Sequence, residues 1–206
     1  MISDSVPWRE ELWRLADRLE KKSKQQRWTE RSSFLVERDM MTSAYAIRRL
    51  NEAHKISDDL AKTRVPVIRH KLIGSVPDIW NRHEIWEHYD LEHGVRDHIT
   101  IPHLCNQLIH SFVWFLSATE DADLFDGAFV ASENERHKHL YFLPVESLID
   151  LCRKVAAEDI GSIQYQRGTD GVMRIVSVKV MEDDGEKSDS GMLMLSAEAR
   201  ASYREP

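Results

Sequence analysis

The feature that most limits the fold of this chain is a long stretch without helix-breaking residues. Residues 8–65 contain neither glycine nor proline, whereas Pro7 and Pro66 lie immediately outside them. Glycine destabilises helix interiors through its backbone entropy, and proline does so through its missing N–H. Because the stretch is also rich in Glu, Lys, Arg, Leu and Ala, it predicts one or two long helices.

The apolar periodicity within this stretch predicts two amphipathic helices. Residues of the first helix that recur at helical spacing are Trp8, Leu12, Leu15 and Leu19. The expected apolar face of the second helix is Met41, Ala44, Ile47 and Leu50. Ser5, Thr29 and Ser57 are the expected N-caps of these helices and of a short helical turn after them. Such stripes must be covered by each other, by the rest of the chain or by another copy.

Beyond Pro66 the pattern changes, because all eight glycines fall from Gly74 onward. Strands are expected near 65–69, 97–101, 111–118, 125–132 and 139–145, with a hairpin of 163–167 and 172–180 and an edge strand at 191–195. Helical segments are expected at 78–91, at 102–110 and after residue 146. Short connections favour a mostly antiparallel sheet with one or two packed helices, and therefore the α+β class. The expected organisation is a helical arm (1–63) and an α+β body (64–206), or one continuous domain.

The composition is that of a water-soluble chain. It has 206 residues, of which 42% are hydrophobic, and its mean hydropathy is −0.48. No run approaches the ~18 apolar residues of a membrane span, and the N-terminus has no basic region followed by an apolar one. We therefore expect a cytoplasmic protein with no membrane association. Cys105 and Cys152 are expected to be reduced thiols in the core.

The charge distribution bears on possible partners. The net charge is −7 and the isoelectric point is about 5.8, so nucleic-acid binding is possible but not favoured. Residues 8–31 carry eight basic and five acidic side chains, a net charge of 8 − 5 = +3, whereas residues 182–189 are mostly acidic. A solvated helix face and an acidic loop explain this pattern. The alternative is an arm that meets a polyanion or an acidic partner.

Two pairs of residues are candidates for catalysis. Arg49 and His54 have the Arg-x4-His spacing that resembles the HEPN family of metal-independent ribonucleases. The resemblance implies an all-helical bundle that dimerises, in which arginine stabilises phosphate charge and histidine does acid–base work on the ribose hydroxyl. Four further pairs fit the looser spacing, among them Arg48 with His54. The second candidate pair is Asn106 and His110, one helical turn apart, with a half-buried histidine as the expected structural role.

The sequence predicts no metal site and no cofactor. The five histidines that could contribute metal ligands are His83, His88, His93, His137 and His139, but no His-Glu-x-x-His or Cys-x-x-Cys signature accompanies them. Residues 133–139 form the densest polar cluster, which could hold a phosphate or a carboxylate, or could be a solvated hairpin tip. Gly168 and Gly171 lie in a hairpin turn, so they do not form a phosphate loop.

The leading hypothesis is a non-enzymatic protein that uses its helical arm as an oligomerising or protein-interaction module. Trp8, Leu12 and Trp13 are the expected contact residues, because large aromatic side chains near a free end are costly to leave in water. The expected partner is a second copy of the chain or another protein. A ribonuclease that uses Arg49 and His54 is the alternative, and a metal-dependent hydrolase at the histidines is a third hypothesis.

Overall fold

Helices occupy most of the first sixty residues, as predicted. The computed structural model describes residues 4–119 and 124–181. Its first helices are α1 (Val6–Ser23), α2 (Glu30–Glu52) and α3 (Asp58–Ala61). Thr29 and Ser57 cap α2 and α3 through their hydroxyl groups, as expected. At α1 the Asp4 carboxylate accepts the Val6 N–H at 2.9 Å, and Ser5 makes no side-chain cap.

In the described part of the chain, seven strands follow in two antiparallel sheets. The larger sheet contains β1 (Arg64–Lys71), β2 (Val95–Thr100), β3 (Ser111–Ala118), β4 (Phe125–Ser132) and β5 (His139–Pro144). Their order is β2-β1-β5-β4-β3, so β2 and β3 are the edge strands. The strands β6 (Ile160–Arg167) and β7 (Met173–Val180) form a separate hairpin. The protein is therefore α+β with a mostly antiparallel sheet, as predicted. The strand expected at 191–195 lies outside the described residues.

Three further helices of the described segments lie between strands. They are α4 (Ile85–His88), α5 (Ile101–Ile109) and α6 (Val145–Ala157). The helix expected over 78–91 was wrong, because only α4 forms there. The reason is local: the side chains of Asp78 and Asn81 accept backbone N–H groups and so stabilise a turn that competes with a helix. No helix of the described segments is both long and apolar enough to cross a membrane.

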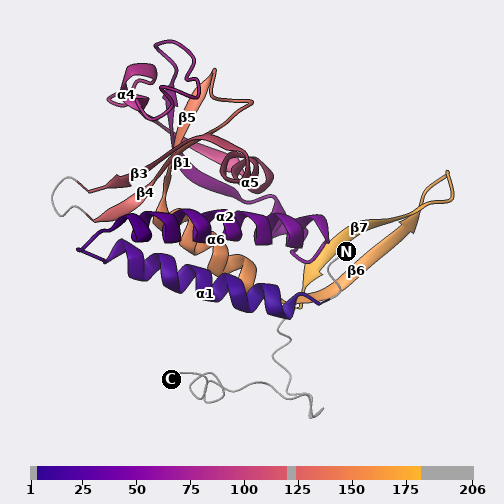
Figure 1. Ribbon diagram of the computed structural model, residues 1–206. Helices are drawn as coiled ribbons and strands as arrows, with labels where there is room; N and C mark the ends of the chain where they lie inside the picture. Colours follow the sequence, from indigo (N-terminus) through magenta and orange to yellow (C-terminus); the bar gives the residue numbers. More distant parts are fainter. Residues whose placement is uncertain (1–3, 120–123, 182–206) are drawn as a thin grey trace.

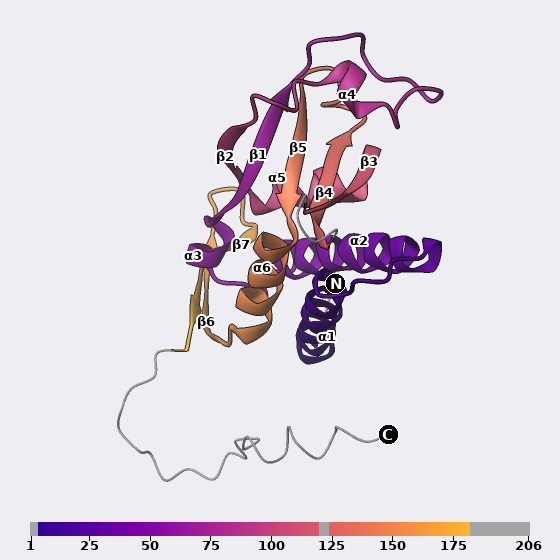
Figure 2. The ribbon, with the colours of Figure 1, turned by 90° about the vertical axis from the view of Figure 1, so that its left-hand side faces the viewer.

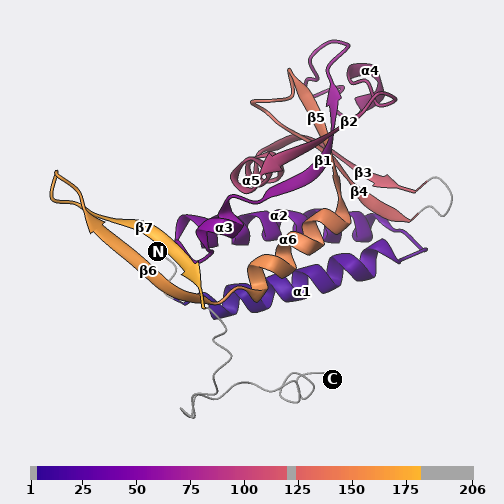
Figure 3. The same cartoon turned by 180° about the vertical axis from the view of Figure 1, so that it is seen from behind.

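The helices α1, α2 and α6 form one layer, and the five-stranded sheet stands on it (Figure 1). Seen from the side, α5 lies beside the sheet and α4 lies at the end farthest from the helix layer (Figure 2). The view from behind shows β6 and β7 leaving the body beside the helix layer, far from α4 (Figure 3). The hairpin is therefore the element that projects, whereas α1 and α2 lie against the rest of the chain.

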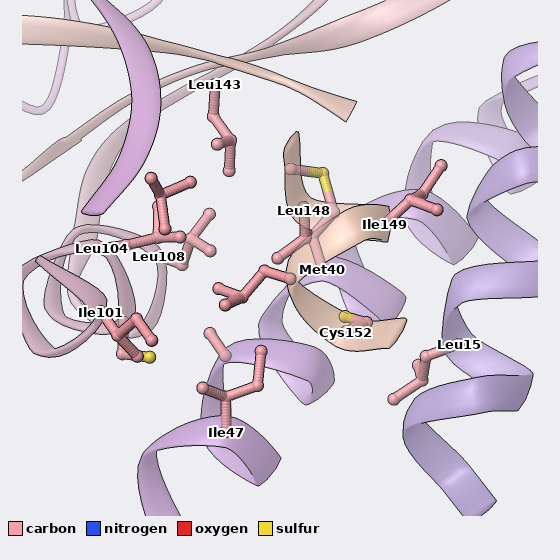
Figure 4. Packing of buried hydrophobic residues seen from close by; sticks show 14 of the residues in the cluster. Leu15, Met40, Ile47, Ile101, Leu104, Leu108, Leu143, Leu148, Ile149 and Cys152 are labelled. Atoms are coloured by element: carbon pink, nitrogen blue, oxygen red, sulfur yellow. The ribbon is translucent and has the colours of Figure 1, made fainter. Parts of the chain in front are cut away.

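The helix layer and one face of the sheet share a single hydrophobic core. Its members converge from four helices and from β5 (Figure 4); they include Leu15, Met40, Ile47, Ile101, Leu104, Leu108, Leu143, Leu148, Ile149 and Cys152. Met40 is fully buried, whereas Met41, expected on this face, is only half-buried. The expected arm, residues 1–63, thus contributes α1, α2 and α3 to the same core as the sheet.

Polar contacts hold α1 against its neighbours. The Arg9 guanidinium donates to the backbone carbonyls of Val155 and Lys55, each at 2.6 Å. Arg153 of α6 pairs with Glu20 of α1. Both cysteines are free and buried, as expected, and burial raises the pKa of each thiol to about 12.

Candidate functional site

The opposite face of the sheet is partly covered by residues 72–94, which we call the acidic aromatic loop. Its acidic side chains are Asp78, Glu84, Glu87, Asp90 and Glu92, opposed by Arg82 alone, so its net charge is 1 − 5 = −4 with neutral histidines. Ile85 and Tyr89 of the loop pack against Val113, Ala131 and Leu140 in a second, smaller core. The loop is therefore attached to the sheet by buried apolar contacts as well as by its covalent connections to β1 and β2.

Hydrogen bonds make this loop a well-held element. Its end is paired to β1, where the Asp90 N–H donates to the Lys71 carbonyl at 3.0 Å. His88 is buried, and its Nδ1 lies 2.8 Å from the carbonyl oxygen of Ser75. The buried Tyr89 hydroxyl donates to a backbone carbonyl of the β4–β5 turn at 2.7 Å, and burial raises the pKa of this hydroxyl. The loop thus has a defined shape before it meets any partner.

The tip of the loop presents two large apolar side chains to solvent. The Asp78 carboxylate accepts the Trp80 N–H at 2.7 Å, and the Asn81 side chain accepts the Asp78 N–H at 2.7 Å. Side chains of this type stabilise turns through such bonds. Ile79 is 68% exposed and Trp80 is 84% exposed as a result. An exposed tryptophan on an ordered turn is a candidate contact residue, because tryptophan is enriched at the hot spots of interfaces.

Further exposed apolar side chains belong to the same loop and to its neighbour, the edge strand β3. Trp86 is exposed, and its ring meets the ring of Phe115 edge to face at 6.4 Å between centroids. The Arg82 guanidinium lies 5.5 Å from the centre of the Phe112 ring. Ile73 and Val76 are exposed as well. The loop and β3 thus provide an aromatic surface of negative charge.

A polar cluster lies on the other face of the sheet, where α5 covers it. Arg69 of β1 pairs with Asp97 of β2 at 2.9 Å, and its Nη1 donates to Nε2 of His139 at 3.0 Å. Desolvation, followed by the charge of Arg69, lowers the pKa of His139. An acceptor role for Nε2 requires the neutral ring, which agrees with this direction.

The second half of the cluster centres on Glu135 in the β4–β5 turn. One oxygen of Glu135 lies 3.3 Å from Nε2 of His103 and 3.4 Å from the hydroxyl of Tyr141. The Tyr141 ring lies near both His103 and His139, with centroid distances of 5.6 and 6.3 Å. A carboxylate–imidazole pair is an arrangement that supports general-base chemistry. Here the Nε2 atoms of both imidazoles face protein groups, so these contacts connect the turn to α5 and connect β1 to β5.

The residues of the proposed ribonuclease pair do not converge. Arg49 is paired with Glu52 at 2.8 Å. His54 is exposed and has a φ of 54°. Its N–H donates to the Asn51 carbonyl and the Lys55 N–H donates to the Leu50 carbonyl, which is the Schellman pattern that ends a helix. The position of His54 is thus explained by the termination of α2.

Asn106 and His110 do not form a common site either. The Asn106 side chain accepts from Arg48 at 3.1 Å and lines a hollow of about 120 Å³ between α2 and α5. His110 ends α5 and is exposed, so its expected half-buried position was wrong. The buried polar residue of this helix is Gln107, which accepts the Ser132 N–H at 2.8 Å.

The histidines considered as metal ligands are dispersed. In the segments 4–119 and 124–181, no three His, Cys, Asp or Glu side chains form a group that could hold a metal ion. His83 and His137 are exposed. His88 is engaged by the Ser75 carbonyl and His139 by Arg69. His93 pairs with Asp90 at 2.9 Å, which raises the pKa of His93 and lowers that of Asp90.

Of the three expected contact residues, Trp13 alone is exposed. Leu12 is fully buried, so it belongs to the protein's own core and is not available to a partner. Trp8 is half-buried against that core, with its ring 6.0 Å from the ring of Tyr45. Trp13 is 41% exposed on the outer side of α1.

Sequence reasoning missed Ile79, Trp80 and Phe115 as surface residues. The helix expected over 78–91 would have buried one side of the segment that contains the two tryptophans. The signal that could have located the surface is the sequence Pro77-Asp78-Ile79-Trp80-Asn81, in which turn-forming residues flank apolar ones. Comparison of the chain with models of protein families, with curated proteins and with solved structures found no match.

Proposed function

We propose that the protein is a non-enzymatic protein-interaction module that associates with a second copy of itself through the acidic aromatic loop. The observation that carries this proposal is the 84% exposure of Trp80 on a turn held by hydrogen bonds. Tryptophan is among the residues that contribute most to binding when buried at the centre of an interface. A surface that is ordered in advance also loses less conformational entropy on binding.

The contact surface in this proposal differs from the helical arm. Leu12 and most of the α1 and α2 stripes are already covered by the chain itself, so they leave little apolar area for a partner. The loop offers Ile79, Trp80 and Trp86 without unfolding any element.

We also propose a cytoplasmic location. Its support is that the two cysteines are free and buried, as in proteins of reducing compartments.

Sedimentation velocity over a range of protein concentrations tests the proposal. The wild-type chain is expected to self-associate, and Trp80→Ala is expected to weaken the association by about 30-fold or more, the effect of losing about 2 kcal/mol at an interface hot spot. Trp80 is largely exposed to solvent, so the variant is expected to unfold at the same denaturant concentration as the wild type.

The matched control is Trp13→Ala, which removes an exposed tryptophan from α1. This variant is expected to associate like the wild type. A wild-type chain that stays monomeric at every concentration would contradict the proposal. Equal weakening by Trp13→Ala and Trp80→Ala would also contradict it, because the association would then not depend on the loop.

A further inference from the structure

Among the residues that the structure describes, the β6–β7 hairpin contacts the body at its base. Val178 is buried there, and its N–H donates to the Asp58 carboxylate of α3 at 3.0 Å. Farther out, Tyr165 is 59% exposed, and Val172 and Met173 are exposed as well. An isolated two-stranded hairpin is only marginally stable in water. Contact with another surface would therefore stabilise the outer half of this hairpin.

The hairpin has one apolar and one polar face. Cross-strand partners lie on the same face of a sheet, and the partners on the first face are Ile163 with Val178, Tyr165 with Ile175, and Arg167 with Met173. On the second face Gln164 faces Ser177, and Gln166 faces Arg174. The face that buries Val178 at the base thus continues outward as an apolar strip that the described part of the chain leaves exposed.

The charge of the hairpin is opposite to that of the acidic aromatic loop. Residues 160–181 contain Arg167, Arg174 and Lys179 against Asp170, a net charge of 3 − 1 = +2. The loop has a net charge of −4, and the whole chain −7. Oppositely charged surfaces favour encounter and fix orientation at an interface. Arg167 lies on the same face as the apolar strip, whereas Arg174 lies on the polar face and pairs with Asp170. The strip thus carries one basic side chain, which complements an aromatic surface with acidic neighbours.

These two surfaces cannot meet within one molecule. The loop that contains α4 lies at the far end of the sheet, whereas the hairpin leaves the body beside the helix layer (Figures 1 and 3). We infer that the hairpin of one copy docks on the acidic aromatic loop of a second copy, in a head-to-tail contact. This inference rests on the proposed function and names the surface that the loop binds. Because the two surfaces differ, each docked copy keeps one loop or one hairpin free, and the chain can extend into a ring or a filament.

A mixing experiment with two full-length variants tests the inference. Trp80→Ala alters the loop and leaves the hairpin intact, whereas Tyr165→Ala combined with Met173→Ala alters the hairpin and leaves the loop intact. All three side chains are exposed, so the variants are expected to keep the wild-type fold. Each variant alone is expected to be monomeric. Their mixture contains one intact pair of surfaces, so it is expected to form a one-to-one heterodimer that grows no further.

The control variant is Gln164→Ala, on the polar face of the hairpin, which is expected to associate like the wild type. The head-to-tail inference is overturned if the hairpin variant associates like the wild type while Trp80→Ala does not, and the proposed function then still stands. A monomeric wild-type chain overturns both. A mixture that stays monomeric overturns the head-to-tail contact and points to another occupant of the hairpin, such as the acidic residues 182–189.

Discussion

The α1–α2 helices and the β6–β7 hairpin are both amphipathic elements, but the chain covers their apolar faces to different extents. Along the stripe of α1 the leucines and the alanine have no accessible surface, and only Trp8 at its beginning is half-buried. The apolar face of the hairpin is buried at Val178 and exposed from Tyr165 outward. Amphipathic periodicity therefore shows that a face needs cover, whereas the topology determines whether the same chain supplies it.

The difference arises from the elements that pack on each of these two regions. The α1 stripe is met by α6, which is distant in the sequence but begins directly after the central strand β5. The hairpin is the last described element, and among the described helices it is α3, with only four residues, that contacts it most. A short helix can cover the base of a hairpin but not its full length.

The largest expected effect tests whether α1 belongs to the core. Leu15→Ala is expected to lower the free energy of unfolding by about 2–5 kcal/mol, because it leaves a cavity among fully buried neighbours. Trp13→Ala, on the exposed side of the same helix, is expected to cost less than about 1 kcal/mol. Denaturant unfolding of both variants measures the difference. A small effect of Leu15→Ala would mean that α1 is peripheral, as a projecting arm would be.

A smaller effect is expected at the base of the hairpin. Val178→Ala removes buried methyl groups and is expected to cost about 1–3 kcal/mol, whereas Val176→Ala, at an exposed position of the same strand, is expected to cost less than about 0.5 kcal/mol. Amide hydrogen exchange is the measurement, because local opening is visible there. Val178→Ala should accelerate exchange in β6 and β7 and leave α1 and α2 unchanged. Equal acceleration throughout would show that hairpin and body unfold as one unit.

The sequence was most informative about local structure. The strand at 111–118 and the strand at 125–132 have the predicted boundaries, and the hairpin was expected from its glycine turn. Helix periodicity located α1 and α2, since their stripes repeat over several turns. The 78–91 segment was misassigned because its apolar residues follow a helical period over only a short stretch. The side chains of Asp78 and Asn81 stabilise a turn there instead of a helix.

The candidate sites were harder to derive, because they depend on which faces come together. His103 contacts Glu135, and Arg69 contacts His139, although each pair is far apart in the sequence; they meet because β1 pairs with β5 and α5 covers that face. Nothing in the spacing of these residues indicates the contacts. The spacing of Arg49 and His54, by contrast, was visible in the sequence, but the structure places Arg49 beside Glu52 and His54 at a helix end.

The smallest expected effect concerns the polar contact between α1 and α6, which has no counterpart between the hairpin and the helix layer among the described residues. Hydrogen bonds from Lys24 and Arg153 lower the pKa of Glu20 to about 2, well below its ordinary 4.5. A carboxylate with a lowered pKa in the folded state stabilises the fold fully above pH 4.5, and this contribution is lost as the pH falls from about 4.5 to about 2. Arg153→Gln should raise the pKa of Glu20 toward 4.5, so the stability of the variant should fall less steeply in that interval.

An NMR titration of the Glu20 carboxyl group separates the two partners of this residue. Lys24→Gln removes a partner on the same helix, whereas Arg153→Gln removes the connection to α6, and both are expected to raise the titration midpoint. The effect on unfolding should be small and should decrease with added salt, since the Lys24–Glu20 pair is exposed and the Arg153–Glu20 pair is partly exposed to solvent. If Arg153→Gln left the midpoint unchanged while Lys24→Gln raised it, α6 would not lie beside Glu20, and the contrast between a covered helix layer and an uncovered hairpin would lose one of its supports.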